Sequence, residues 1–237
     1  MRVCHLSDTH LGYREFHRID SDTGINQREQ DVYDALHQAI DRILDLDPDL
    51  VLHAGDLFDN VRPTNRAVNV ATEQFGRLSR EEIPTVVIAG NHDTPKIVTT
   101  GTIMQSLNLL PHIHAVTSDP RAGEGGYQRI DVENMMVHAV SDASTQEQLI
   151  RRLDELEPDP DYEWNLLMLH AGVRQVQDQV FSGEFNEHHV GRDVIAREGF
   201  DYVALGHYHK RMVVPLGSDT ETEARYCGAT ERFSFNE

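Results

Sequence analysis

The sequence predicts an α/β fold in which strands form mixed sheets covered by helices. Short apolar runs, each long enough for one buried strand, recur along the chain, and most are separated by segments of helical periodicity. Two further pairs of apolar runs are separated by polar turns, as in antiparallel hairpins. Alternating strands and helices indicate a layered α/β domain, and the hairpins argue against a purely parallel sheet.

Five apolar runs are expected to be buried strands, and they lie at 3–6, 50–54, 85–89, 166–169 and 202–205. Apolar residues recur at helical spacing within 32–44, 68–78 and 149–156. Asp47-Pro48 should end the first of these helices, and Thr64 is placed to cap the second. The expected hairpins pair 127–132 with 135–140 and 212–215 with 224–227. We therefore expect one mixed sheet, or two sheets packed face to face, in a single domain over 1–237.

Composition excludes several classes of protein. An apolar share of 39% is sufficient for a buried core. No run approaches the roughly 20 apolar residues of a membrane helix, and residues 1–10 lack the apolar stretch of a signal peptide. The only cysteines are Cys4 and Cys227, which rules out a disulfide scaffold and favours a reducing, cytoplasmic setting. No membrane partner is expected.

The chain is strongly acidic, with a formal net charge of −19, and its 21 basic residues include only two lysines, Lys96 and Lys210. This balance argues against a simple basic surface for nucleic acid. An excess of acidic residues with almost no lysine is typical of proteins from halophilic archaea. Concentrated salt in their cytoplasm screens the repulsion between carboxylates. An ordinary acidic mesophilic protein is the alternative, and the halophilic origin is favoured.

Polar residues follow the five predicted strands at the points where they end. Asp8 and His10 follow the first strand, Asp56 the second, and Asn91, His92 and Asp93 the third. The fourth strand leads to His170, and the fifth leads to His207 and His209. Because the carboxyl ends of strands in open α/β sheets meet in one crevice, these side chains are expected to converge. Each motif alone could be a cap or an ordinary polar loop, but five such coincidences are improbable.

The residue types indicate a pair of divalent transition metal ions. Imidazole and carboxylate suit Mn, Fe or Zn, whereas no cysteine lies near these motifs. A shared carboxylate can hold two ions about 3.5–4 Å apart, which suits phosphoryl displacement. A bound metal also lowers the pKa of its water, so that hydroxide is available near neutrality.

These motifs, in this order, resemble the calcineurin-like metallophosphoesterase superfamily over nearly the whole chain. Within it, SDTHLGYR (7–14), HAGDLF (53–58), AGNHD (89–93), LGHYHK (205–210) and GATERFSF (228–235) resemble the DNA double-strand-break-repair nucleases called SbcD in bacteria and Mre-eleven in archaea and eukaryotes. The resemblance implies a four-layer α-β-β-α sandwich with a dimetal site at one edge. The family chain normally continues into a capping domain and an ATPase-binding region, and the sequence up to Glu237 is expected to lack both.

The resemblance also assigns the site residues. One ion would be held by Asp8, His10 and His209, and the other by Asn91, His170 and His207, with Asp56 bridging both. His92 would be catalytic, acting on the phosphate oxygens. Position 59 is often histidine in archaeal and eukaryotic members, where it helps to position the substrate phosphate, but it is Asp59 here, as in bacterial members, and Asp59 is a candidate substrate-binding residue. Tyr13 and Tyr208 lie inside motifs and are candidates for stacking on a base.

The function expected from the resemblance is a Mn-dependent DNA nuclease. It would act as a 3′-to-5′ exonuclease and single-strand endonuclease in double-strand-break repair, through in-line attack of a metal-bound hydroxide. Its implied partners are DNA, an ATPase of the SbcC (Rad-fifty) type and a second copy of the chain, joined through helices near 64–79 and 97–110. The alternatives are a small-molecule phosphodiesterase or phosphomonoesterase, and a metal-stabilised scaffold without turnover.

Overall fold

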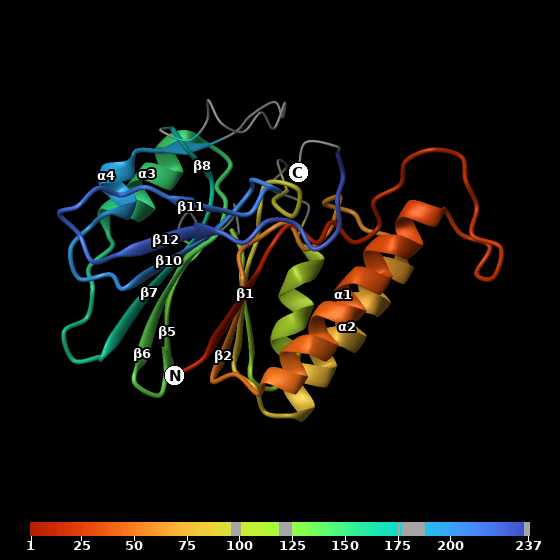
Figure 1. Cartoon of the computed structure of the whole chain (residues 1–237), viewed down its shortest axis with the longest axis horizontal. Coiled ribbons are helices and arrows are strands. Elements are labelled where there is room, and N and C mark those ends of the chain that lie inside the picture. Colours follow the sequence, from red (N-terminus) through yellow and green to blue (C-terminus); the bar gives the residue numbers. More distant parts are fainter. Residues whose placement is uncertain (96–100, 119–124, 175, 177–187, 235–237) are drawn as a thin grey trace.

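The computed structural model describes residues 1–95, 101–118, 125–174, 176 and 188–234. It forms four layers, in which two sheets pack face to face and helices cover the outer face of each (Figure 1). The four-layer sandwich that the family resemblance implies is therefore confirmed, with one parallel and one mixed sheet.

The first sheet is parallel and has the strand order β1-β2-β3-β4. Its strands are β1 (Val3–Leu6), β2 (Leu50–His53), β3 (Thr85–Ile88) and β4 (Ile113–Val116). Its outer face is covered by α1 (Gln27–Leu46), α2 (Asn65–Arg80) and the 3₁₀ helix η1 (Ile103–Leu109). A helix was expected over 97–110, and the structure has η1 in its second part, whereas 97–100 lie outside the described residues.

The second sheet is mixed and has the order β11-β12-β10-β7-β6-β5. Its central strands run parallel, and an antiparallel strand closes each side, because β5 pairs with β6 and β11 pairs with β12 as the two expected hairpins. The strands are β5 (Tyr127–Val132), β6 (Met135–Val140), β7 (Trp164–His170), β10 (Tyr202–Gly206), β11 (Met212–Val214) and β12 (Glu223–Tyr226). Helices α3 (Gln146–Asp154) and α4 (Arg192–Ile195) cover it, and β8 (Gly172–Val173) pairs with β9 (His189–Val190) above it.

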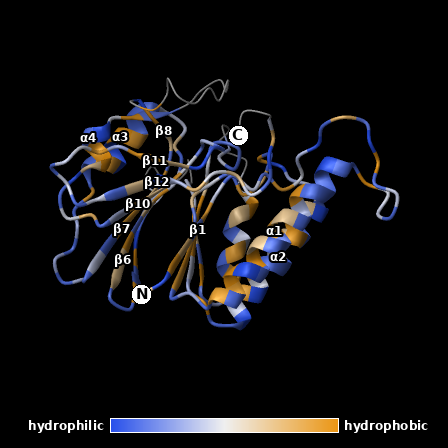
Figure 2. Cartoon of the chain, in the orientation of Figure 1, coloured by the Kyte–Doolittle hydropathy of each residue, from blue (hydrophilic) through white to orange (hydrophobic). Residues whose placement is uncertain are grey.

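The core follows the apolar pattern of the strands. Strands β2, β3 and β7 are buried almost throughout, because each lies between a helix layer and the other sheet. Their alternate residues therefore contribute to a cluster between the sheets and to two further clusters, one beneath the helices of each sheet. Figure 2 shows the resulting amphipathic helices, with orange faces against the sheets and blue faces outward.

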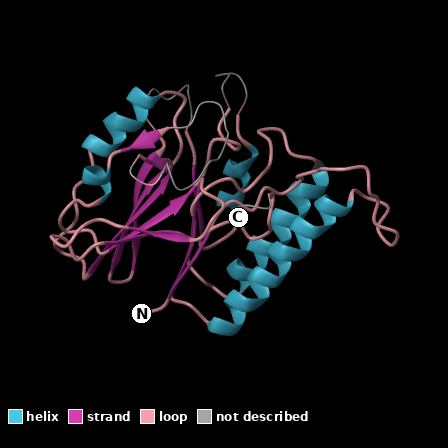
Figure 3. Cartoon of the chain, turned by 45° about the horizontal axis from the view of Figure 1, so that its top comes forward, coloured by secondary structure: helices cyan, strands magenta, loops and turns pink. Residues whose placement is uncertain are grey.

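Local signals set the ends of the two long helices. The Asn26 side chain accepts hydrogen bonds from the backbone N–H groups of Arg28 and Glu29 at the start of α1, and Asp47 ends it in the left-handed conformation. Thr64 caps α2 as expected, with its hydroxyl accepting from the N–H of Ala67. Figure 3 shows α1 and α2 as the two long helices that lie side by side next to the strands. Among the described residues, no helix is both long enough and apolar enough to cross a membrane.

Candidate dimetal centre

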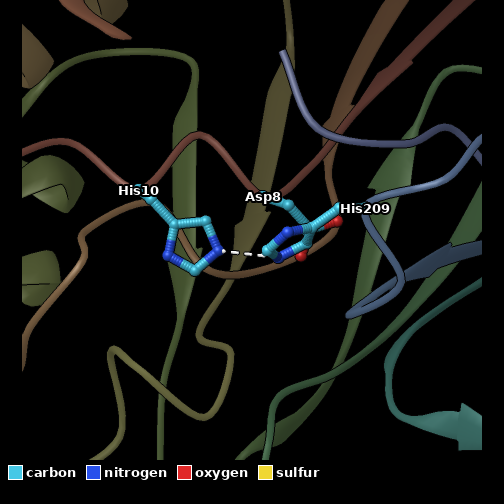
Figure 4. A group of neighbouring side chains, drawn as sticks. All are labelled: Asp8, His10 and His209. Carbon is cyan, nitrogen blue, oxygen red and sulfur yellow. Dashed lines mark hydrogen bonds between the residues drawn. The ribbon is translucent and has the colours of Figure 1, made fainter. Parts of the chain in front are cut away.

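Three side chains that were expected to share one ion lie together at the ends of β1 and β10. Asp8, His10 and His209 each offer one ligand atom, and these atoms lie within 4.8 Å of one another. Figure 4 shows the two imidazoles facing each other, with Nε2 of His10 3.1 Å from Nε2 of His209. We call these three residues the first half-site.

The residues expected at the other ion also meet, although they come from β3, β7 and β10. Asn91 Oδ1 lies 3.0 Å from His170 Nε2 and 3.2 Å from His207 Nδ1. We call Asn91, His170 and His207 the second half-site. Five loops from two sheets thus bring seven expected ligands to one edge of the sandwich.

Asp56 lies between the two half-sites. Its Oδ2 atom is 3.1 Å from His170 Nε2 and 3.7 Å from His10 Nε2. Its carboxylate is also grouped with Asp8 and His170 as a possible metal-binding cluster. This position is suited to a carboxylate shared by two ions.

The loops that carry these ligands have unusual backbone conformations. Positive φ angles occur at Asp8 (53°), His10 (43°), Asp56 (53°) and His207 (100°). Residues other than glycine rarely adopt them, and they persist where surrounding contacts hold the chain. Here the N–H of Asp8 donates to the carbonyl of Gly55 at 2.9 Å, and the N–H of His207 donates to Asp8 Oδ1 at 2.9 Å. The ligand loops of the two sheets are thereby tied together.

Two glycines make room for the ligands. A Cβ atom on Gly55 would lie 2.3 Å from Nδ1 of His170, and one on Gly90 would lie 2.1 Å from Oδ1 of Asp56. Neither approach is possible for a side chain, so both positions require glycine. This close approach is why glycine precedes Asp56 and Asn91 in the motifs.

Asp93 supports the centre without being one of the expected ligands. Its carboxylate is buried and accepts hydrogen bonds from the backbone N–H groups of Leu57, Phe58 and Gly90, at 3.0, 2.9 and 3.1 Å. It therefore holds the loop after β2 against the loop after β3. The sequence motif contained Asp93, but only the structure assigns it this role.

The charges of the centre favour a cation. Burial opposes the ionisation of Asp56, but the imidazoles of His170, His10 and His92 hold its pKa well below the usual range. Burial likewise opposes protonation of His170, but the Asp56 carboxylate raises the pKa of His170 to about 10. A site that stabilises positive charge at this point, and offers imidazole, carboxylate and amide oxygen, fits divalent transition metal ions.

His92 lies beside the first half-site. Its Nδ1 is 2.8 Å from the carbonyl oxygen of Asp59, and its backbone N–H donates to Asp56 Oδ1 at 2.9 Å. Asp59 also approaches the site, with Oδ1 3.7 Å from Nδ1 of His10, and His10, Asp59 and His92 form a third possible metal-binding group. His92 and Asp59 are thus both next to the expected ligands.

The two tyrosines have different surroundings. Tyr13 is partly exposed near the first half-site, and its hydroxyl donates to Glu15 at 2.5 Å. Tyr208 is only 1% exposed, and its ring packs in the core against Tyr226 at a centroid distance of 4.8 Å. The expectation that Tyr208 stacks on a base needs correction, because a buried ring offers no face to a nucleotide.

Several histidines left out of the site have structural surroundings. His53 is fully buried, its Nε2 lies 3.1 Å from the Thr9 hydroxyl, and burial lowers its pKa to about 3. His138 is buried beside Tyr127 and Asn165. His188 pairs with Asp142 at 2.7 Å.

The fold and the site define a metallophosphoesterase. Residues 1–211 match the family model of the calcineurin-like phosphoesterases, and the chain belongs to that family. Curated relatives of this chain include archaeal proteins named DNA double-strand break repair protein Mre11. That of Methanocaldococcus jannaschii is 29% identical over 238 residues, covering 100% of this chain and 58% of the relative. That of Sulfurisphaera tokodaii is 32% identical, covering 91% of this chain and 50% of the relative.

The chain therefore spans about half to three-fifths of the length of these relatives. Solved structures share its fold at low sequence identity. A dimetal phosphatase from Danio rerio has a TM-score of 0.53 at 10% identity, covering 97% of this chain and 88% of that one. The protein TT1561 of Thermus thermophilus has a TM-score of 0.50 at 16% identity, covering 83% and 84%.

Proposed function

We propose that this chain is the phosphoesterase part of a Mn-dependent DNA nuclease that acts in double-strand-break repair. The observation that carries the proposal is the convergence of seven expected ligand side chains at one edge of the sandwich, with Asp56 between the half-sites. The relatives named Mre11 support DNA as the substrate. Two Mn ions are the proposed cofactors, and a reducing cytoplasm is the proposed compartment.

Some residues of the site would bind the metal ions, and His92 would take part in proton transfer. Bound divalent ions supply positive charge that activates water and stabilises charge developing on the phosphate. The first half-site, the second half-site and Asp56 would hold those ions. His92 adjoins them and would donate a hydrogen bond or a proton to a phosphate oxygen as the phosphodiester is attacked in line.

Two residues are proposed to help in handling the substrate, Asp59 through His92 and Tyr13 by direct contact. Asp59 lies beside His10 and His92, so it would help to orient His92 through its carbonyl oxygen. Tyr13 is partly exposed next to the first half-site, which suits stacking on a base of a single strand. The proposed activities are 3′-to-5′ exonuclease and single-strand endonuclease, with an SbcC (Rad50) type ATPase as partner.

A homodimer is also proposed, through the surface of α2 and η1. Met104 and Leu107 of η1 are buried in the chain's own core, which accounts for part of the apolar character of this segment. Leu109 and Ile103 point outward, with 84% and 38% of their surfaces exposed. From the family resemblance, α2 and η1 are expected to join two copies of the chain. The exposed apolar residues of η1 support this surface as the interface.

A small-molecule phosphodiesterase or phosphomonoesterase is the second candidate. It is favoured by one observation, the net charge of −19, which disfavours attraction of a polyanion to the protein surface. The same metal centre could serve either reaction.

The experiment compares end-labelled single-stranded and duplex DNA with bis-p-nitrophenyl phosphate as substrates, with and without Mn. A DNA nuclease cleaves both DNA and the chromogenic ester, and a chelator abolishes both activities. Cleavage of the small ester alone would favour the second candidate. If the chain binds two metal ions but hydrolyses no phosphoester, it is instead a metal-stabilised scaffold without turnover.

A further inference from the structure

The last described segment of the chain returns to the metal centre. After β12, residues 228–234, which we call the strap, run alongside the loops that carry the first half-site. Ala229 forms an isolated parallel bridge with Ser7, and its N–H donates to the carbonyl of His209 at 3.0 Å. The strap is therefore attached directly before Asp8 and at His209.

Phe233 brings an aromatic ring against two expected ligands. Its centroid lies 4.9 Å from that of His10 and 5.1 Å from that of His209, with interplanar angles of 74° and 62°. It also packs edge to face on Tyr13, at 4.8 Å and 73°. These distances and angles are those of favourable aromatic pairs.

A second anchor holds the strap against α1. The Arg28 guanidinium lies 3.2 Å from Glu231 and 2.8 Å from Asp31, and it also donates to the carbonyl of Arg232. The residue immediately before Phe233 is thereby fixed to the first turn of α1. Because Arg28 is only 21% exposed, this anchor is better protected from solvent than a surface ion pair.

We propose that Phe233 is a positioning residue for the first half-site, and that the strap links the order of this half-site to α1. His10 and His209 point at each other across 3.1 Å, so their ring orientations decide whether both nitrogens can bind one ion. Phe233 packs on both imidazoles in edge-to-face geometry and so restricts their orientations. Outer groups that orient metal ligands through hydrogen bonds commonly change metal affinity by about 10- to 100-fold when they are removed, and we expect an effect at the lower end of this range for a packed ring.

The effect of changing Phe233 should be selective, because its ring packs on both imidazoles of the first half-site. Mn affinity should fall markedly at one site and much less at the other. If Phe233 only filled space beneath the helices, any apolar side chain of similar volume could replace it. Both Mn affinities would then stay unchanged. The inference rests on the dimetal part of the proposed function and not on DNA as the substrate.

The test is Mn titration of the chain by isothermal calorimetry and electron paramagnetic resonance. Phe233→Leu, which keeps an apolar side chain but removes the ring, should weaken one of two Mn sites by about 10-fold. Phe233→Tyr should retain both affinities. Arg28→Ala should weaken the same site by a smaller factor, whereas Arg77→Ala, which removes the ion pair between α2 and Asp41, should change neither. Circular dichroism establishes that each variant is folded.

The outcomes separate the inference from the proposed function. Two unchanged Mn affinities in Phe233→Leu would overturn the positioning role, and so would an equal loss at both sites. If the unaltered chain binds no Mn, the dimetal proposal and this inference both fail. If it binds two Mn ions but cleaves no DNA, the nuclease proposal fails while the Mn titration still decides the role of Phe233.

Discussion

The imidazole of His92 stands edge-on to the imidazole of His10, with 4.7 Å between ring centroids and an interplanar angle of 89°. This arrangement brings His92 close to the first half-site while its Nδ1 is engaged by the carbonyl oxygen of Asp59. A side chain held in this way is suited to act on a substrate atom next to the metal centre. The role is testable because metal binding and hydrolysis can be measured separately.

His92→Gln is expected to keep both Mn ions and to lose most hydrolysis, by about 10²- to 10⁴-fold, the usual contribution of a general acid or base. Elemental analysis and phosphodiester hydrolysis measure the two properties. His114→Gln, which alters an exposed histidine on β4, is the control and should change neither. If His92→Gln instead loses a metal ion, His92 is itself a metal ligand, together with His10 and Asp59.

Asp56→Ala is expected to abolish tight metal binding at both half-sites. The carboxylate approaches His10 and His170 on either side, so its removal takes one ligand from each ion and leaves the imidazoles without this buried counter-charge. Calorimetric Mn titration measures the loss, which should exceed 100-fold, beyond the about 10- to 100-fold typical of residues that only orient ligands. Asp131→Ala, on the exposed side of β5, is the matched control. Retention of one tight site would show that Asp56 serves a single ion.

The strand ends were predictable from sequence because each buried strand is a short apolar run that stops at a polar residue. Asp8, Asp56 and His170 follow such runs closely, and parallel pairing brings their loops to one edge. The mixed character of the second sheet also followed from a local pattern, since the turn between β5 and β6 is a hairpin signal.

Side-chain direction and long-range contacts could not be predicted in the same way. Tyr208 lies between two expected ligands in sequence, but its ring is turned into the core against Tyr226 of β12. Phe233 is separated from His10 by over two hundred residues, so its contact depends on the path of the whole chain. Asp93 similarly binds amides on another loop, which no local pattern encodes.

Leu109→Glu is expected to convert a dimer to a monomer if α2 and η1 form the interface. Leu109 is 84% exposed, so the substitution should change the stability of the fold by no more than about 0.5 kcal/mol. Light scattering measures the mass. Val213→Glu introduces the same charge at an exposed position on β11, in the other sheet, and should leave the dimer intact. A monomeric unaltered chain would contradict the proposed interface.

His138→Gln is expected to make the protein less sensitive to acid. Burial lowers the pKa of His138 to about 4, so between about pH 6.5 and 4 the unfolded chain binds a proton that the folded chain does not. The stability present above about pH 6.5 is therefore lost as the pH falls, by at most about 1.4 kcal/mol per unit. Denaturant unfolding at about pH 7 and about pH 5 should show a smaller loss in the variant. His17→Gln, at an exposed position before α1, should lose as much stability as the unaltered chain.

Salt should stabilise the fold, because the net charge of −19 is carried by a chain with only two lysines. Repulsion among carboxylates destabilises a compact state, and it is screened as the Debye length falls from about 10 Å at 0.1 M to about 3 Å at 1 M salt. The unfolding temperature, followed by circular dichroism, should therefore rise as KCl increases from about 0.1 M to 2 M. A variant with Asp45→Lys and Glu73→Lys, both exposed on the outer helices, carries less negative charge and should show a weaker rise. An unfolding temperature that stays constant or falls over this range would show that carboxylate repulsion does not limit stability, and it would remove the physical basis for a halophilic origin.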